Sequence, residues 1–136
     1  RNDVDVLFTA APSFPVKLRV RDENGKPTTA AFVIRDSAQR VYPSQAKRLA
    51  PDFAFHPQIY RADGEVLKLP SGEYTVMFER GPESIRQVHK LVVVGKPVTA
   101  TFQVKRWIDP SLMGWWSGDH HIHATVIDHL FSDFLL

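Results

Sequence analysis

The chain of 136 residues contains no cysteine. Disulfide bonds and thiolate zinc sites are therefore excluded, and the redox compartment stays open. The sequence also lacks any apolar run near the ~18 residues that a membrane-spanning helix requires, so we expect no transmembrane segment. No internal repeat or low-complexity tract is visible. These absences leave a globular chain whose length suits about one domain.

The chain also has no large excess of charge of either sign. The 17 Lys and Arg residues nearly balance the 15 Asp and Glu residues, which gives a formal net charge of +2. A charge this small predicts neither nucleic-acid binding nor attachment to anionic membranes. The apolar share of 43% is enough for one ordinary hydrophobic core.

Alternation with a period of two residues dominates most of the chain. Residues 16–22 and 98–105 alternate apolar with polar or charged side chains, which predicts strands with one buried face. Shorter or less regular strand-like runs occupy residues 4–9, 30–35, 59–61, 66–69, 73–80 and 86–94. We expect the outer half of the last run to be buried on both faces. Turn signals separate the runs and no helical pattern lies between them, so the sequence predicts an antiparallel β-sandwich of about seven strands.

The predicted core is the apolar face of these strands. Its candidate residues are Val16, Leu18, Val20, Phe32, Ile34, Leu69, Tyr74, Val76, Phe78, Phe102 and Val104.

Residues 43–58 interrupt the strand pattern with three prolines and no clear period. We interpret them as a long surface loop. Either Phe53 and Phe55 hold the loop down on the sheet, or the loop, with His56, contacts a ligand.

Two parts of the strand region resemble a known kind of module. The sequence reads DENGKP at residues 22–27, AFVI at 31–34 and LPSGEYTV at 69–76. In these segments Gly25 and Gly72 permit a positive φ at tight turns. The segments resemble the carboxypeptidase-regulatory-like, transthyretin-like β-sandwich modules. That resemblance implies an accessory domain, which packs beside or holds another domain.

The strongest chemical signal is residues 115–123, which read WWSGDHHIH and hold three of the six histidines of the chain. In an extended segment, Asp119, His121 and His123 share one face, while His120 and Ile122 lie on the other. Two imidazoles at such positions can converge on one metal ion, with the aspartate as a third ligand or as an acceptor that orients an imidazole. Nitrogen and oxygen donors without thiolate suit Zn, Mn, Fe or Ni, and the spacing does not choose between them.

The same string resembles the Ser-Gly-Asp-x-His-x-His opening of the CehA/McbA-type metallohydrolases, which belong to the polymerase-and-histidinol-phosphatase (PHP) superfamily. The resemblance implies that His121 and His123 are metal ligands, that Asp119 is the family aspartate, and that His120 is no ligand. It implies a cluster of two or three divalent metal ions that activates water for phosphoester, carbamate or amide hydrolysis. It also implies a distorted β/α barrel after the string, and some members carry a β-sandwich before it.

A β/α barrel takes ~250 residues, so most of such a domain would lie beyond residue 136. We therefore expect a lead-in at residues 1–13, a β-sandwich domain at 14–106, a linker at 107–118 and a truncated start of a metallohydrolase domain at 119–136. The three tryptophans, Trp107, Trp115 and Trp116, are interpreted as a hydrophobic hinge along this linker.

Within the last segment, Asp128 and His129 are expected to be solvated. Its remaining apolar residues have helical spacing and form one stripe, namely Ile127, Leu130, Phe131, Phe134 and Leu135. The stripe would pack on the sandwich, on another copy of the chain to give a homo-oligomer, or on a missing C-terminal catalytic domain. Two functional hypotheses follow. The chain is the accessory sandwich and opening segment of a metal-dependent hydrolase, without activity by itself, or it is a stand-alone binding or assembly module with incidental histidines.

Overall fold

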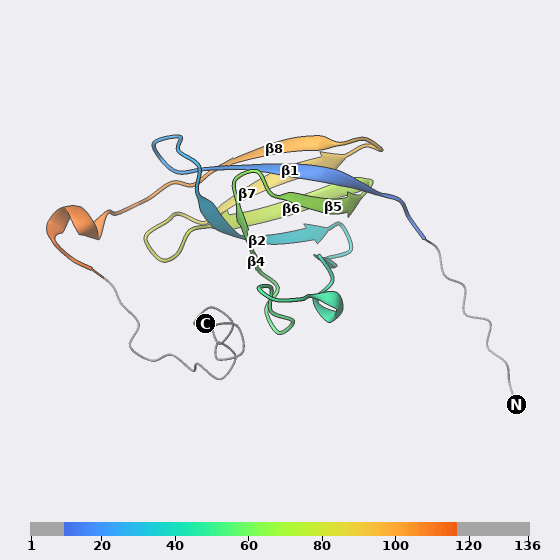
Figure 1. Ribbon diagram of the computed structural model, residues 1–136, viewed down its shortest axis with the longest axis horizontal. Coiled ribbons are helices and arrows are strands. Elements are labelled where there is room, and N and C mark those ends of the chain that lie inside the picture. The colour runs from blue at the N-terminus through green and yellow to red at the C-terminus, as the bar shows by residue number, and fades with distance from the viewer. Residues whose placement is uncertain (1–9, 117–136) are drawn as a thin grey trace, which may run out of the picture.

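The structure, a computed structural model, describes residues 10–116 and is mainly β (Figure 1). The strands in this part of the chain are β1 (Ser13–Arg21), β2 (Thr29–Asp36), β3 (Val41–Tyr42), β4 (Ile59–Ala62), β5 (Val66–Pro70), β6 (Gly72–Glu79), β7 (Gln87–Val93) and β8 (Val98–Gln103). Two short 3₁₀ helices accompany them, η1 (Gln45–Lys47) and η2 (Pro110–Met113). The predicted strand at residues 4–9 and the predicted segment 119–136 lie outside the described residues.

The strands form two sheets. One has three strands in the order β5-β1-β8, and the other has the order β3-β2-β6-β7 with β4 also paired to β2. The predicted β-sandwich is thereby confirmed. One pairing differs from the prediction, because β8 runs parallel to β1 with Val16 opposite Val98, whereas the other strand pairs are antiparallel. Alternation reveals which face of a strand is buried, but it carries no information about the direction of the neighbouring strand.

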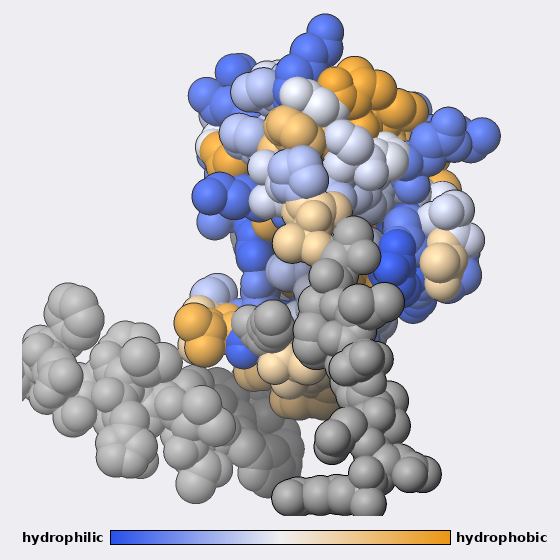
Figure 2. All heavy atoms as spheres, turned by 90° about the vertical axis from the view of Figure 1, so that its right-hand side faces the viewer, coloured by the Kyte–Doolittle hydropathy of each residue, from blue (hydrophilic) through white to orange (hydrophobic). Residues whose placement is uncertain are grey.

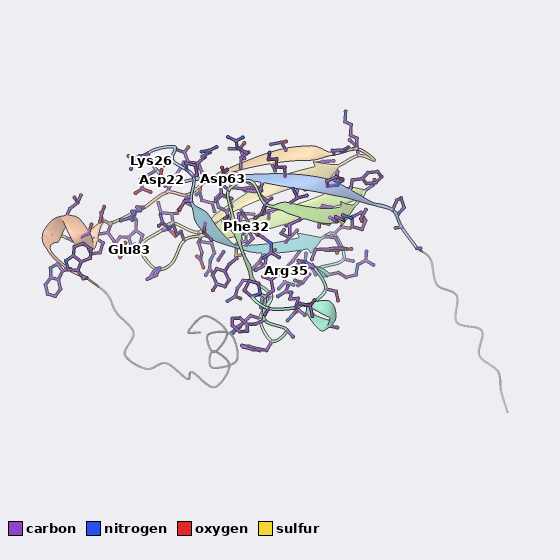
Figure 3. The ribbon with its side chains drawn as sticks, in the orientation of Figure 1. Asp22, Lys26, Phe32, Arg35, Asp63 and Glu83 are labelled. Carbon is purple, nitrogen blue, oxygen red and sulfur yellow. The ribbon has the colours of Figure 1, made fainter. Side chains whose placement is uncertain are left out.

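The hydrophobic core lies between the sheets, and every predicted core residue is buried. At its centre Phe32, Phe78 and Phe102 pack with ring centroids 5.1–6.0 Å apart. Figure 3 shows Phe32 between the two layers. Further buried side chains that the prediction did not include are Ala30, Ile59, Leu67, Leu91 and Val93.

Strand β7 departs from its prediction. Leu91 and Val93 are buried, but Val88, Val92 and Val94 are exposed. The expectation of burial on both faces was therefore wrong. The reason is that the second face of β7 points away from the sandwich, and no layer among the described residues covers it.

Two predicted turns are found, and each is fixed by polar contacts. Between β1 and β2, Gly25 has a φ of 77°, and one Asp22 carboxylate oxygen accepts hydrogen bonds from the backbone N–H groups of Asn24 and Lys26 at 2.9 and 2.8 Å. Before β6, the Tyr74 hydroxyl donates back to the carbonyl of Pro70 at 2.8 Å, so the ring is buried while its hydroxyl is satisfied. Gly72 has a φ of 158°, which is close to extended backbone.

Residues 43–58 leave the sheet and return to it at almost the same point. On one edge of β2, Phe32 lies opposite Ile59 of β4, and Ile34 lies opposite Tyr42 of β3. The loop is thus an insertion between two strands that together occupy one edge of β2.

Among the described residues, no helix is long and apolar enough to cross a membrane.

Candidate functional site

The residues predicted to bind metal, Asp119, His121 and His123, lie outside the described residues, as do His120, Asp128 and His129. What the structure describes is the segment that leads to them, residues 104–116. This segment leaves the sandwich after β8 and carries η2 away from the strands at one end of the molecule (Figure 1).

The segment begins as an extension of the sandwich. The N–H of buried Val104 donates to the carbonyl of Arg21 at 2.7 Å, which continues the β1–β8 pairing beyond β8. The N–H of Ile85 donates to the carbonyl of Lys105 at 2.8 Å, and Ser84 and Arg106 form an isolated bridge. The chain therefore leaves the sandwich along the loop that joins β6 and β7.

Arg106 holds this exit in place through three carboxylates. Its guanidinium lies 3.1 Å from Glu23, 3.4 Å from Glu83 and 3.0 Å from Asp109. The arginine is 29% exposed, so each pair is partly screened by solvent. Glu83 lies on the side of the sandwich from which η2 extends (Figure 3). Because the partners come from three separate stretches of chain, the guanidinium ties the exit to two loops of the sandwich.

Backbone contacts continue past Arg106. The backbone N–H of Trp107 donates to the carbonyl of Glu83 at 3.1 Å, and its indole N–H donates to the carbonyl of Pro82 at 2.9 Å. The indole is thereby pinned at its polar edge, while most of its apolar surface is exposed.

Helix η2 has caps at both ends. The Asp109 carboxylate accepts hydrogen bonds from the hydroxyl and the N–H of Ser111 at 2.5 and 3.2 Å. The hydrogen bond from the Ser111 side chain, together with the nearby Arg106 charge, lowers the pKa of Asp109 although desolvation opposes this. At the other end Gly114 adopts a φ of 77°, and the N–H of Trp115 donates to the carbonyl of Pro110 at 3.0 Å. The predicted linker is consequently a hydrogen-bonded element as far as Trp115.

Large apolar side chains project from this element. The exposed fractions are 64% for Trp107, 85% for Leu112, 58% for Met113, 71% for Trp115 and 84% for Trp116. We call these five residues the linker surface. By contrast, Figure 2 shows that the end of the sandwich at which β1 begins is mostly hydrophilic or neutral, with hydrophobic residues in separate patches.

The loop at residues 43–58 is organised by Arg48. Its guanidinium donates to the carbonyls of Pro43, Phe53, His56, Pro57 and Gln58, with distances of 2.9–3.2 Å for the bonds to Pro43, Phe53, Pro57 and Gln58. Burial lowers the pKa of Arg48 from its usual value. One cation therefore supplies donors to carbonyls at both ends of the loop.

An ion pair also anchors the loop to the sheet. The guanidinium of Arg61 on β4 forms two hydrogen bonds with the Asp52 carboxylate, and that contact lowers the pKa of Asp52. The aromatic side chains do not perform this role, because Phe53 and Phe55 are exposed, as is Leu49. The prediction that aromatic residues hold the loop on the sheet was wrong. The ligand-contact alternative stays a prediction.

A shallow groove of about 420 Å³ lies where the end of this loop meets the outer face of the larger sheet. The residues that line it include Val33, Tyr60, Met77 and Arg86. Arg86 is paired with Glu79 through two hydrogen bonds of 2.9 Å, and this contact lowers the pKa of the Glu79 carboxyl. The charge of Arg86 is thus already paired within the sheet.

Within residues 10–116, no group of three or more His, Asp or Glu side chains is arranged to hold a metal ion. The three carboxylates around Arg106 already have a cation between them. The roles of Arg48 and Arg106 were missed by sequence reasoning, since their partners are mainly backbone carbonyls or distant carboxylates. A weak signal was present for Arg106, which follows the last strand and precedes Asp109 by three residues.

A scan of the sequence against models of known protein families finds no match. A search of curated proteins finds no matching protein either.

Proposed function

We propose that this chain is the accessory β-sandwich and opening segment of a metal-dependent hydrolase of the CehA/McbA type. The observation that carries the proposal is the string SGDHHIH at residues 117–123, which follows a β-sandwich through a short connecting element. The order of sandwich, connection and histidine string matches the order that the family resemblance implies.

The donor set suits a divalent metal. His121 and His123 offer imidazole nitrogens, and Asp119 offers a carboxylate, a combination that fits Zn, Mn or Fe. When bound in such a site, the metal supplies an activated water for hydrolysis. In this proposal the two histidines bind the ion, and Asp119 either completes that side of the coordination shell or orients one imidazole.

Two imidazoles and one carboxylate do not make a hydrolytic centre. Catalysis also requires further ligands and a general acid. In the proposal these come from a catalytic domain, so residues 1–136 alone are expected to bind metal without hydrolysing a substrate. The sandwich provides a rigid base, because Arg106 and the caps of η2 fix the path of the chain as far as Trp115.

Titration of the metal-free chain with Zn²⁺ tests this assignment. We expect one Zn²⁺ site by isothermal titration calorimetry. We expect His121→Ala and His123→Ala each to weaken it at least about tenfold, because loss of a group that only orients a metal ligand already lowers affinity about 10–100-fold. His120→Ala and His56→Ala are matched controls that remove an imidazole elsewhere and should bind Zn²⁺ like the original chain. Equal Zn²⁺ affinity in the original chain and His121→Ala would refute the assignment.

A second candidate, a stand-alone binding module, is favoured by the loop at residues 43–58. The loop presents Leu49, Phe53 and Phe55 to solvent on a framework fixed by Arg48. In this candidate the aromatic residues contact a partner, and a homo-oligomer is the simplest case. Sedimentation of Phe55→Ser would then give a lower mass than the original chain, while an unchanged monomer in both would count against self-association through the loop.

A further inference from the structure

We infer that the linker surface is covered by the apolar stripe of residues 127–135 of the same chain. The linker surface is formed by Trp107, Leu112, Met113, Trp115 and Trp116, which are 58–85% exposed in residues 10–116. This inference concerns the fold of the chain and does not depend on metal binding.

Contacts among the described residues fix the backbone of the linker surface and the indole of Trp107. The Trp107 indole is held by its hydrogen bond to Pro82, and the caps of Asp109 and Gly114 fix η2. A preformed surface loses little conformational freedom when another segment packs on it. These five large exposed apolar side chains lie within ten consecutive residues, 107–116, and apolar groups that gather on a surface mark contact sites more often than single exposed residues do.

The segment at residues 127–135 requires an apolar surface on which to pack. Ile127, Leu130, Phe131, Phe134 and Leu135 have the spacing i, i+3, i+4, i+7, i+8, which places them on one face of a helix. A helix of this length is marginal in water by itself and requires a packing partner. The linker surface and the stripe can therefore each bury the apolar side chains of the other.

Tethering favours this pairing over association between chains. The ten residues between Trp116 and Ile127 span up to about 35 Å when extended, which is ample for a return to η2. Contact within one chain benefits from the high effective concentration that a short linker gives. Charge agrees with this arrangement, because residues 117–136 contain three Asp residues but no Lys or Arg, so all 17 basic residues lie in the rest of the chain.

The arrangement has a consequence for the histidine string. Residues 119–123 lie between the linker surface and the stripe along the chain. If the stripe packs on the linker surface, both ends of the string are held near the end of the sandwich.

The three tryptophans of the chain all belong to the linker surface, so intrinsic fluorescence reports on its cover directly. The experiment compares the full 136-residue chain with Leu130→Asp, which puts a charge on the stripe, and with the matched control His129→Asp, which puts it beside the stripe. Measurements are made with a chelator present, so that metal binding has no influence. Circular dichroism establishes that the sandwich is folded in each protein.

We expect Leu130→Asp to shift the tryptophan emission to longer wavelength and to raise acrylamide quenching about twofold, because the indoles pass from a packed to a wet environment. His129→Asp should behave like the original chain. The inference is overturned if the original chain already shows fully exposed tryptophans, or if both variants change equally. It is also overturned if the packed emission appears only as protein concentration rises, which would identify a second copy as the cover.

Discussion

Tyr74 shows how one side chain can be placed by sequence and yet have properties that only the structure reveals. Its burial was predicted from the alternation in residues 73–80 and is confirmed. The hydrogen bond from its hydroxyl to Pro70 was not predicted, because it depends on how the chain turns between β5 and β6. Burial raises the pKa of Tyr74 from its ordinary value of 10.0 to about 12.

This shift predicts a loss of stability at high pH. Between pH 10 and about 12 the unfolded chain releases the Tyr74 proton while the folded chain keeps it, so the free energy of unfolding falls as pH rises. Urea unfolding of Tyr74→Phe across this range should show a shallower fall than the original chain. Burial also raises the pKa of Tyr42, so part of the fall should persist in the variant.

Below pH 10, Tyr74→Phe should lower the free energy of unfolding by about 1 kcal/mol, because the bond to Pro70 is lost. Tyr60→Phe is the control, since it removes the hydroxyl of a half-exposed tyrosine on β4. Identical pH profiles for Tyr74→Phe and the original chain would contradict the explanation.

At the scale of elements, alternation was informative where one face of a strand is clearly polar. In β1 it separates the buried Val16, Leu18 and Val20 from their exposed neighbours, because charged residues fill the other face. In β7 both faces carry valine or leucine, so the sequence does not distinguish the face that meets the core from the outer one. Pairing with β6 decides the matter, because Leu91 lies opposite the buried Tyr74, so the face that carries Leu91 and Val93 meets the core.

The loop at residues 43–58 was predicted as a loop, but its internal support was not. Aromatic residues in a proline-rich loop suggest packing on the sheet, whereas the structure uses a cation surrounded by carbonyl oxygens. Such a network forms only once the loop has closed, and no periodic pattern in the sequence encodes it. Arg48 therefore looks like an ordinary basic residue until its surroundings are known.

Replacement of Arg48 should loosen this loop selectively. Arg48→Lys keeps the charge but loses the planar fork that reaches several carbonyls, so we expect the free energy of unfolding to fall by about 1.5–3 kcal/mol. Limited digestion with chymotrypsin should cut faster at Phe53 and Phe55. Leu49→Ala is the matched control in the same loop, because Leu49 is 84% exposed. Equal cleavage rates for Arg48→Lys and Leu49→Ala would show that Arg48 does not hold the loop.

For the whole molecule, the sandwich was predictable, while the metal site stays a prediction. Two-residue alternation repeated over many strands has few outcomes other than a pair of packed sheets. For the histidine string, the residue types at 117–123 predict metal ligands. Their positions in space cannot be predicted from the sequence, because they depend on what packs around the string. The connecting element at residues 104–116 was predicted only in part. Its tryptophans were interpreted as a hydrophobic hinge, which stays a prediction. The Arg106 ion pairs that fix the element were not predicted, because they depend on Glu23 and Glu83, which are distant in the sequence.

The position of the core leads to a prediction about shortened chains. The buried side chains among the described residues lie between Val16 and Val104, so residues 10–116 should unfold in one cooperative transition with nearly the midpoint of the full chain. Residues 10–103 should be less stable, because they lack the Val104 side chain, which is 1% exposed, and full burial of a valine contributes about 1.5 kcal/mol or more. They also lack the Arg106 contacts to Glu23 and Glu83. Thermal unfolding followed by circular dichroism compares the three chains. A midpoint for residues 10–116 as low as that for residues 10–103 would mean that residues outside 10–116 stabilise the sandwich, and the sandwich would not be an independent folding unit.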